Sequence, residues 1–345
     1  MKPAPTGRSG ALLFVSELNT TQIADILMMA QYGLLEVYNG ENAQADIVFL
    51  HGLRGDREKA WTKNGVVWPK DLLPDDIPAS RIFLFGYDTN ITSTGRSGPS
   101  KTEIHGDAED VCAKLAAERL STQTVSDSNA VDRPIIFVAH SLGGLVAAQI
   151  LVDGENKPEN SVEGSITRNT HGMVFLGTPF RGSSAAKPAE AVRRVLQLFK
   201  VDTQQQTLKL LGVDSERLDE LTRAFSQVLN KRRTSKDIDL RIEASFFYET
   251  LKTRWGIGSV QIVETESAQL HGCGDAAPIR ADHIGICKFE TKDADGYATV
   301  VAAIQKAMIP PDASPSHGNR ILNILGKAVN VANGSISIGS QVNNL

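Results

Sequence analysis

Cysteine is scarce in this sequence. The 345 residues include 3 cysteines, at Cys112, Cys273 and Cys287. An odd and sparse set without the spacing of metal ligands argues against a disulfide framework and against a cysteine-based metal site. We therefore expect no metal ion or other cofactor, and a reducing compartment such as the cytosol.

Long apolar runs and an excess of charge are also missing. No stretch of about 18 apolar residues occurs, so a membrane-spanning helix is not predicted. The basic residues near the N-terminus lead into no apolar run typical of a signal peptide. Lysines and arginines number 36 against 40 aspartates and glutamates, a formal net charge of −4. Nucleic-acid binding usually needs a basic stripe, so no nucleic-acid partner is expected.

The chain does contain apolar runs that alternate with segments of helical spacing. Strands alternating with helices predict the α/β class, a mostly parallel central sheet flanked by helices. A turn signal at Asn39-Gly40 predicts that the first two strands form a hairpin or are neighbours. The predicted strands are 34–38, 47–50, 82–87, 135–139, 173–176, 242–248 and 259–263, and the predicted helices are 108–120, 144–151, 189–229 and 298–308.

Composition also divides the chain along its length. Residues 1–33 are interpreted as an N-terminal extension with one helix near 23–29. The main α/β domain is predicted over 34–308. It includes a helical insert at about 183–232, whose leucines suit either a lid over a pocket or ordinary helix packing. Prolines and serines indicate a linker at 309–319, and residues 320–345 form a separate tail.

Residues 139–143, with the sequence Ala-His-Ser-Leu-Gly, match the pattern of a nucleophile elbow. That pattern has small residues two before and two after a serine that lies between a strand and a helix. Small residues are needed because the sharp turn brings the neighbouring strand and helix close to the serine. The strand predicted at 135–139 and the helix predicted from 144 supply this context. Ser141 is therefore predicted to be the nucleophile of a serine hydrolase.

An elbow serine also needs backbone N–H groups that stabilise the developing oxyanion, each contributing roughly 3–4 kcal/mol. One donor belongs to the residue after the nucleophile, and the second comes from the loop after an earlier strand. The first donor is thus Leu142. The strand at 47–50 leads into a loop with Gly52 and Gly55, and we assign the second donor to Leu53 within it.

The base that accepts the serine proton is a histidine that follows the nucleophile, since the chain order in this class is Ser, acid, His. Both His271 and His283 follow the last predicted strand, whereas His317 lies in the linker. His283 stands just before the closing helix, where the histidine loop is expected. We therefore predict that His283 is the base.

The acid that orients the histidine is less determined. Glu249 ends the strand predicted at 242–248, while Glu264 and Glu266 follow the last predicted strand. Asp282 is adjacent to the base and is poorly placed to bond its Nδ1 atom. We favour Glu249, and Glu266 remains the main alternative.

Together these motifs resemble the lipase-like hydrolases of the serine-active-site-containing type, which include the SesB-like domains found with fungal NOD-like receptors. The resemblance covers about residues 34–308. It implies an α/β-hydrolase fold with a Ser/acid/His triad, carried here onto Ser141 and His283, and leaves the acid and the substrate open. Ala139 replaces the usual glycine, and Phe180-Arg181 stand where a His-Arg pair is common. The residues that carry the resemblance are 45–53, 60–62, 68–69, 72–74, 85–88, 139–144, 177–179 and 282–283.

The tail has a different character. Residues 329–345 alternate apolar and polar side chains for most of their length and contain neither charge nor proline. Such a segment can stack in register, with Asn/Gln ladders and dry apolar faces. The sequence Ile-Ser-Ile-Gly at 336–339 resembles fungal prion-like signalling motifs and the animal RHIM core. A plain edge strand or disordered tail is the alternative interpretation.

Two functions follow as hypotheses. The first is a serine hydrolase that cleaves an ester, with a lipid as the expected substrate, in the manner of a lipase or esterase. On the amyloid interpretation its tail self-assembles with a NOD-like receptor or another protein carrying a matching motif. The enzyme would then be an effector of programmed cell death that associates with a membrane when activated. The second hypothesis is a catalytically idle scaffold that acts by prion-like assembly.

Overall fold

The computed structural model describes residues 32–52, 55–87, 103–123, 130–180, 188–198, 215–255 and 258–309. The chain divides into two units, Met1–Met308 and Ile309–Leu345, and the description below concerns the first. The helix predicted near 23–29, nearly all of the predicted linker and the 320–345 tail lie outside the described residues.

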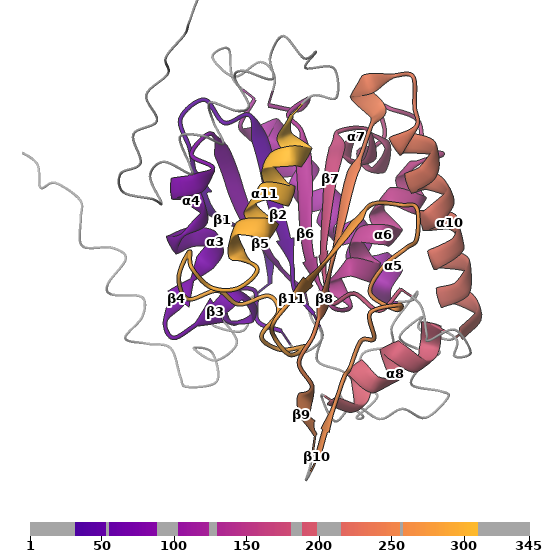
Figure 1. The fold of residues 1–345 in the computed structure, drawn as a ribbon. Coiled ribbons are helices and arrows are strands. Elements are labelled where there is room, and N and C mark those ends of the chain that lie inside the picture. The colour runs from indigo at the N-terminus through magenta and orange to yellow at the C-terminus, as the bar shows by residue number, and fades with distance from the viewer. Residues whose placement is uncertain are drawn as a thin grey trace, which may run out of the picture. The chain divides into compact units, whose positions relative to one another are not determined.

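Seven strands form one sheet in the order β1-β5-β2-β6-β7-β8-β11 (Figure 1). Strand β1 runs antiparallel to β5, and the other neighbouring pairs are parallel. This arrangement confirms the predicted α/β class. The strands are β1 (Gly33–Asn39), β2 (Ala45–Leu50), β5 (Ser80–Gly86), β6 (Ile135–His140), β7 (Thr170–Leu176), β8 (Glu243–Glu249) and β11 (Asp275–Ile279).

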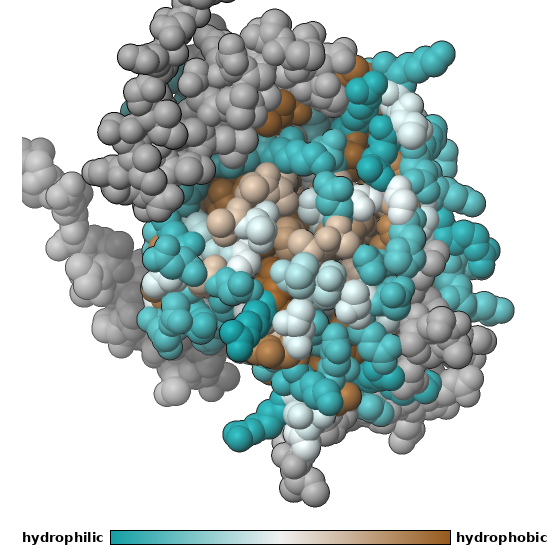
Figure 2. Space-filling model, in the orientation of Figure 1, coloured by the Kyte–Doolittle hydropathy of each residue, from teal (hydrophilic) through white to brown (hydrophobic). Residues whose placement is uncertain are grey.

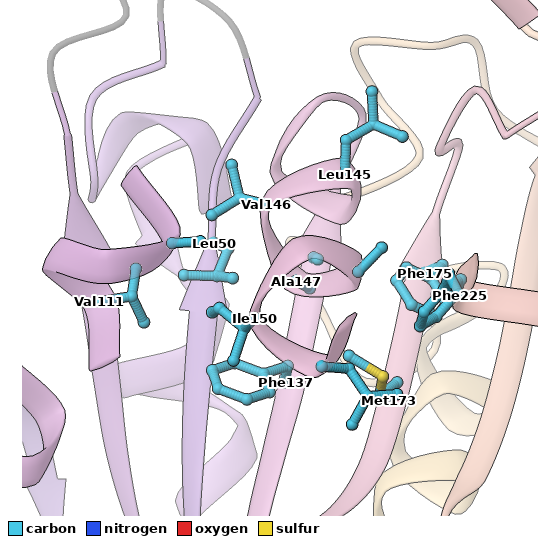
Figure 3. Packing of buried hydrophobic residues seen from close by; sticks show 14 of the residues in the cluster. Leu50, Val111, Phe137, Leu145, Val146, Ala147, Ile150, Met173, Phe175 and Phe225 are labelled. Atoms are coloured by element: carbon cyan, nitrogen blue, oxygen red, sulfur yellow. The ribbon is translucent and has the colours of Figure 1, made fainter. Parts of the chain in front are cut away.

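Helices cover both faces of this sheet (Figure 1). On one face, Val111 of α5 and Ile150 of α6 pack with Leu50 and Phe137 of the sheet (Figure 3). Helix α11 covers the other face, through side chains such as Val300. The described helices are α3 (Trp68–Asp71), α4 (Leu73–Asp76), α5 (Glu103–Ser121), α6 (Gly143–Gly154), α7 (Val162–Arg168), α8 (Pro188–Leu198), α10 (Ser215–Arg233) and α11 (Tyr297–Met308).

Strand β6 shows why the central strands have continuous apolar runs. Phe137 and Ala139 point into the core under α5 and α6, whereas Ile136 and Val138 point into the core under α11. Successive side chains of a strand alternate between the two faces, and both faces of this sheet are covered. All six residues of β6 are consequently buried.

The predicted pairing of the first two strands is wrong. Strand β5 lies between β1 and β2 and bonds to both, so β1 and β2 are not neighbours. The Asn39-Gly40 signal marks a turn, but Gly40 N–H donates to Ser80 O and directs the chain towards the start of β5. A local turn signal cannot specify which strand is inserted between two others.

The strand predicted at 259–263 is shorter than expected and does not belong to the main sheet. Residues 258–260 form β10 (Gly258–Val260), which pairs with β9 (Thr253–Trp255) in a separate two-stranded sheet. The main sheet ends instead with β11 at its edge, beside β8. This strand contains Pro278 and is largely exposed, so it lacks the apolar run of a buried strand. An edge position tolerates a proline, which cannot donate a backbone hydrogen bond.

The helical insert is described in part. Helices α8 and α10 lie within the region predicted to be helical from 189 to 229, and residues 199–214 lie outside the described residues. None of the described helices is both long and apolar enough to cross a membrane.

A buried carboxylate ties together the amino ends of the central strands. Asp46, the second residue of β2, is fully buried and accepts hydrogen bonds from three arginines. Its oxygens lie 2.8 Å from Arg81 Nε, 2.5 Å from Arg119 Nη1 and 2.9 Å from Arg133 Nη1. Arg119 and Arg133 also donate to main-chain carbonyls, among them Val131 O and Ala43 O. This network joins β2, β5, α5 and the segment that leads into β6.

Replacing Asp46 by asparagine should destabilise the protein strongly. Three buried guanidinium groups would lose their shared counter-charge, and breaking such a buried network costs about 3–5 kcal/mol. Urea-induced unfolding measures this loss. Asp110→Asn is the matched control, because Asp110 pairs with Lys114 on an exposed helix face and should contribute little. An effect of Asp46→Asn as small as that of the control would contradict the structural role of the network.

Candidate active site

Ser141 occupies a sharp turn between β6 and α6. Its backbone φ is +53°, in the left-handed region that non-glycine residues rarely adopt. The Ser141 N–H group donates to Leu176 O over 3.0 Å, and Gly144 N–H donates to Ser141 O over 3.0 Å. The side chain is fully buried. The turn therefore has the strained strand-to-helix geometry that the elbow motif predicts.

Close packing around the turn explains the small residues of the motif. A Cβ atom on Gly143 would lie 2.5 Å from Leu50 O, and one on Gly52 would lie 2.9 Å from Ser141 Cβ. Both glycines are required for the β2 loop to pass this close to the serine. Ala139 is different, because it is a buried strand residue whose side chain belongs to the core. Alanine in place of the usual glycine therefore fits at this position.

Three predicted residues come together at this turn. His283 Nε2 lies 2.9 Å from Ser141 Oγ, and His283 Nδ1 lies 2.8 Å from Glu249 Oε2. A carboxylate can only accept, so the Nδ1 atom carries a hydrogen and donates a hydrogen bond to Glu249. That leaves Nε2 as the acceptor for the serine hydroxyl. All three side chains are fully buried.

The second oxygen of Glu249 is also held in place. Glu249 Oε1 accepts hydrogen bonds from the backbone N–H groups of Ile262, at 2.8 Å, and Val263, at 3.0 Å. Gln261 Nε2 donates to the main-chain oxygen of Glu249 over 2.9 Å. The carboxylate is therefore fixed on the side away from His283 by the chain that returns after the β9–β10 hairpin.

The alternative acids lie elsewhere. Glu266 is exposed and pairs with His271, with 3.0 Å between Oε2 and Nε2. Glu264 pairs with Arg194 of α8 at 2.7 Å. His271 precedes β11, so it does not follow the last strand as predicted. His283 comes after β11, in the loop before α11.

Of the two predicted oxyanion donors, the structure describes one. Leu142 follows the nucleophile and caps the N-terminus of α6, where the helix dipole favours negative charge. Its N–H group makes no hydrogen bond to another described residue. Leu53, the predicted second donor, lies outside the described residues. On either side of the two residues that are not described, Gly55 N–H donates to Gly52 O over 3.1 Å.

Helix α8 of the insert lies beside these groups. Val195 packs with Ile262, Val263 and Ala268 in a small apolar cluster, and Leu142 contacts the same cluster. The insert thus contributes apolar packing next to Leu142 and next to the backbone that holds Glu249. Within the described residues, no group of three or more His, Cys, Asp or Glu side chains could hold a metal ion.

A family model described as "Putative serine esterase (DUF676)" matches residues 42–260, more than half of the chain. The chain belongs to this family. Protein SERAC1 of Homo sapiens is 29% identical over 284 residues, and that of Mus musculus 30% over 273. These matches cover 77% and 74% of this chain but only 39% and 38% of the relatives, so the chain spans about two fifths of their length.

Solved structures of low sequence identity align as well. An esterase from Pyrococcus furiosus is 13% identical with a TM-score of 0.43, covering 81% of this chain and 91% of that one. A soluble variant of monoglyceride lipase from Saccharomyces cerevisiae, solved with a substrate analogue, is 13% identical with a TM-score of 0.39. It covers 80% of this chain and 89% of that one.

Two residues of this DUF676 member that hold His283 were missed from the sequence. His140 Nε2 donates to the main-chain oxygen of His283 over 2.9 Å. Thr253 Oγ1 accepts from the backbone N–H of His283 over 3.0 Å. The backbone of the histidine is therefore fixed on both sides. The adjacency of His140 to Ser141 was a usable signal, whereas Thr253 lies in a strand that the sequence did not predict.

Phe180, which stands where the family resemblance suggests a histidine, is part of the hydrophobic core. Phe180 is buried and stacks on Phe225, with ring centroids 5.4 Å apart, and meets Phe175 edge to face at 4.9 Å. Its partner in the motif, Arg181, lies outside the described residues.

Two buried histidines beside the site are neutral. Burial lowers the pKa of His51 to about 4, and its hydrogen bond to Gly52 O only partly opposes this. Burial, together with the neighbouring His283, lowers the pKa of His140 to about 3. His51 Nδ1 lies 2.8 Å from Gly52 O and so carries the proton. Its Nε2 atom is a buried acceptor with no hydrogen-bond partner among the described residues.

These lowered pKa values predict a pH-dependent stability. An unfolded histidine binds a proton below about pH 6.5, whereas folded His51 and His140 stay neutral until about pH 4 and about pH 3. Their contribution is therefore complete above pH 6.5 and is lost progressively as pH falls from about 6.5 to the folded pKa values. His51→Asn should reduce the loss between pH 6.5 and 5 by up to about 1.4 kcal/mol per pH unit. Urea unfolding at several pH values measures how the free energy of unfolding of wild type and of His51→Asn depends on pH. Identical slopes would contradict a neutral buried His51.

Proposed function

We propose that this chain is a serine esterase that cleaves carboxylic esters, with lipid acyl esters as its substrates, through Ser141, His283 and Glu249. The observation that supports this most is the buried series of hydrogen bonds from Glu249 through His283 to Ser141, at 2.8 and 2.9 Å. It ends on a serine with the strained backbone of an elbow. This combination is what an activated nucleophile needs, and packing of the core alone would not require it.

In the proposed reaction, Ser141 Oγ attacks the ester carbonyl while its proton passes to His283 Nε2. Glu249 accepts the Nδ1 hydrogen bond and stabilises the imidazolium that forms. The tetrahedral intermediate collapses, and His283 gives the proton to the departing alcohol. Water, deprotonated by His283, then attacks the acyl-serine and forms a second tetrahedral intermediate. When this intermediate collapses, the carboxylic acid is released and His283 returns the proton to Ser141 Oγ.

The oxyanion of each tetrahedral intermediate would accept from the N–H groups of Leu142 and Leu53. Leu142 has a donor at the N-terminal end of α6, with no other described partner. The helix dipole adds to the stabilisation of negative charge there.

The apolar surroundings support a lipid acyl group as the substrate class. Val195 and Leu198 of α8 and the side chain of Leu142 lie in one apolar cluster beside the nucleophile turn. An acyl chain is stabilised by removal of its apolar surface from water, about 0.8 kcal/mol per buried CH₂. A strongly charged substrate would not be stabilised by burial in this way.

The alternative is a catalytically idle scaffold. Nothing in the arrangement of the three side chains favours it, because nucleophile, base and acid are all present at hydrogen-bond distance. The alternative makes a different prediction for active-site labelling, so one experiment distinguishes the two.

Ser141→Ala should abolish labelling by a fluorophosphonate probe and lower kcat for a short-chain ester by on the order of 10⁴- to 10⁶-fold. His283→Ala should have a similar effect, because the hydroxyl would lose its base. Glu249→Gln should lower kcat by on the order of 10⁴-fold, since an amide there no longer selects the required imidazole tautomer.

Glu266→Gln is the matched control for the acid. Glu266 pairs with His271 on the surface, so its replacement should leave kcat unchanged. If folded wild-type protein took up no probe and cleaved no ester, the esterase proposal would fail and the scaffold would be favoured. Equal losses in the two glutamate variants would contradict the assignment of the acid.

We further propose that residues 320–345 switch the enzyme by amyloid-like assembly with a partner that carries a matching segment, such as a NOD-like receptor. The support comes from the sequence. After Lys327 the tail has no charged residue, and apolar and polar side chains alternate around 336–339. In-register stacking of such a segment satisfies every backbone group and buries identical apolar faces.

A peptide spanning 318–345 should form fibrils that raise thioflavin fluorescence and seed fresh peptide. Ile338→Pro is the matched control, because a proline removes one backbone donor from the stack and should suppress assembly. A wild-type peptide that stays monomeric at high concentration would exclude the proposed switch.

A further inference from the structure

The β9–β10 hairpin projects from the body of the molecule at the end of the sheet where Ser141 lies (Figure 1). The chain enters it directly after Glu249 and leaves it at Gln261. The hairpin therefore begins at the proposed acid and ends at the backbone groups that hold that acid. Its strands pair only with each other and are not part of the seven-stranded sheet.

Two large apolar side chains are exposed beside this hairpin. Leu251 is 44% exposed and Ile284, the residue after His283, is 41% exposed. Leu251 N–H donates to Ala281 O over 3.0 Å, and His283 N–H donates to Thr253 Oγ1 over 3.0 Å. These bonds hold the two segments side by side. Leu251 and Ile284 thus lie on adjoining loops next to the proposed catalytic base.

The charge of the hairpin is of one sign. Residues 250–261 contain Lys252 and Arg254 and no acidic residue. Both cations are exposed, and neither forms an ion pair with an acidic side chain of the described residues. The nearest acid along the chain to Ile284 is Asp282, whose Oδ1 accepts from Gly285 N–H at 2.8 Å. In Figure 2, hydrophilic residues line the hairpin and hydrophobic residues appear where it meets the body.

We propose that Leu251, Lys252, Arg254 and Ile284, here called the hairpin surface, dock the protein on an anionic lipid surface. Exposed apolar side chains next to exposed cations suit this partner, because the apolar side chains enter the acyl boundary while the cations meet the anionic headgroups. Docking there places the loop of His283 against the lipid. The inference rests on the proposed lipid esterase function, since it explains how an ester within a lipid surface comes to lie next to Ser141.

The charge pattern favours a lipid surface over a protein partner. The side chains that contact it would be two aliphatic and two cationic groups on a projecting element, without the acidic groups that fix orientation against a specific protein. Electrostatic attraction to an anionic bilayer requires only cations near the surface and is screened by salt. Binding to lipid should accordingly depend on headgroup charge and on ionic strength.

Sedimentation of the full chain with lipid vesicles tests the proposal. Wild type should bind vesicles of phosphatidylcholine with phosphatidylserine, bind pure phosphatidylcholine more weakly, and lose affinity as salt is raised. Leu251→Ser with Ile284→Ser, and separately Lys252→Glu with Arg254→Glu, should each weaken binding on the order of tenfold. Leu120→Ser is the matched control and should bind as wild type. Leu120 is 65% exposed, and its neighbour Arg119 bonds Asp46 at the opposite end of the sheet.

Hydrolysis separates this proposal from the esterase proposal. Both hairpin-surface variants should cleave a soluble short-chain ester at the wild-type rate but hydrolyse vesicle lipid more slowly. Ser141→Ala should bind vesicles normally and cleave neither substrate. Wild type that ignores anionic vesicles, or variants that bind them as wild type does, would overturn the docking proposal while soluble-ester activity still reports on the triad. Equal affinity for neutral and anionic vesicles would overturn the role of the cations.

Discussion

The left-handed backbone of Ser141 is the constraint on which the geometry of the site depends. It turns the chain from β6 into α6, which are separated by only Ser141 and Leu142, and a serine in that conformation is strained. Neighbouring strands hold it there. Ser141 N–H bonds to Leu176 O of β7, while Gly52 lets the loop after β2 approach the serine side chain. The strands β2, β6 and β7 are held by their burial, and β2 and the start of β6 also by the Asp46 network at their other ends. The strained turn is therefore supported by well-packed strands.

The proposed base and the proposed acid are positioned in a different way: His283 lies in the loop after β11, and Glu249 is the last residue of β8. His283 is held through its backbone, by His140 on its carbonyl and Thr253 on its amide, and Glu249 is held by two amides. Gly177 has a φ of +59°, and a Cβ there would lie only 3.3 Å from His283 Nδ1. Bonds to the main chain thus fix the His283 loop and the Glu249 carboxylate, which the strands alone would not hold. His140 links the two systems, since it is bonded covalently to the nucleophile and by hydrogen bond to the base.

Features encoded by contiguous residues could be predicted from the sequence, and those that depend on distant pairing could not. The elbow, the buried strands and the main helices each have a local pattern, so the α/β fold followed from them. The hairpin expected for the first strands is wrong because β5 inserts between β1 and β2. The edge strand β11 was missed because Pro278 and its exposure conceal it. That error also left the choice between Glu249 and Glu266 open, since proximity to His283 depends on where β11 and the β9–β10 hairpin place the loops.

The segment from Glu249 to Val263 joins the proposed acid to the proposed docking surface, and the two roles do not conflict. Its two ends are joined by hydrogen bonds between the Glu249 carboxylate and the amides of Ile262 and Val263. What lies between them is a closed loop, and enlarging such a loop costs little additional entropy. The hairpin can therefore project and vary in sequence while the carboxylate stays fixed. Thr253 is the exception, since its hydroxyl contacts His283, so the base of the hairpin is constrained by the site while residues beyond it are free to respond to a surface.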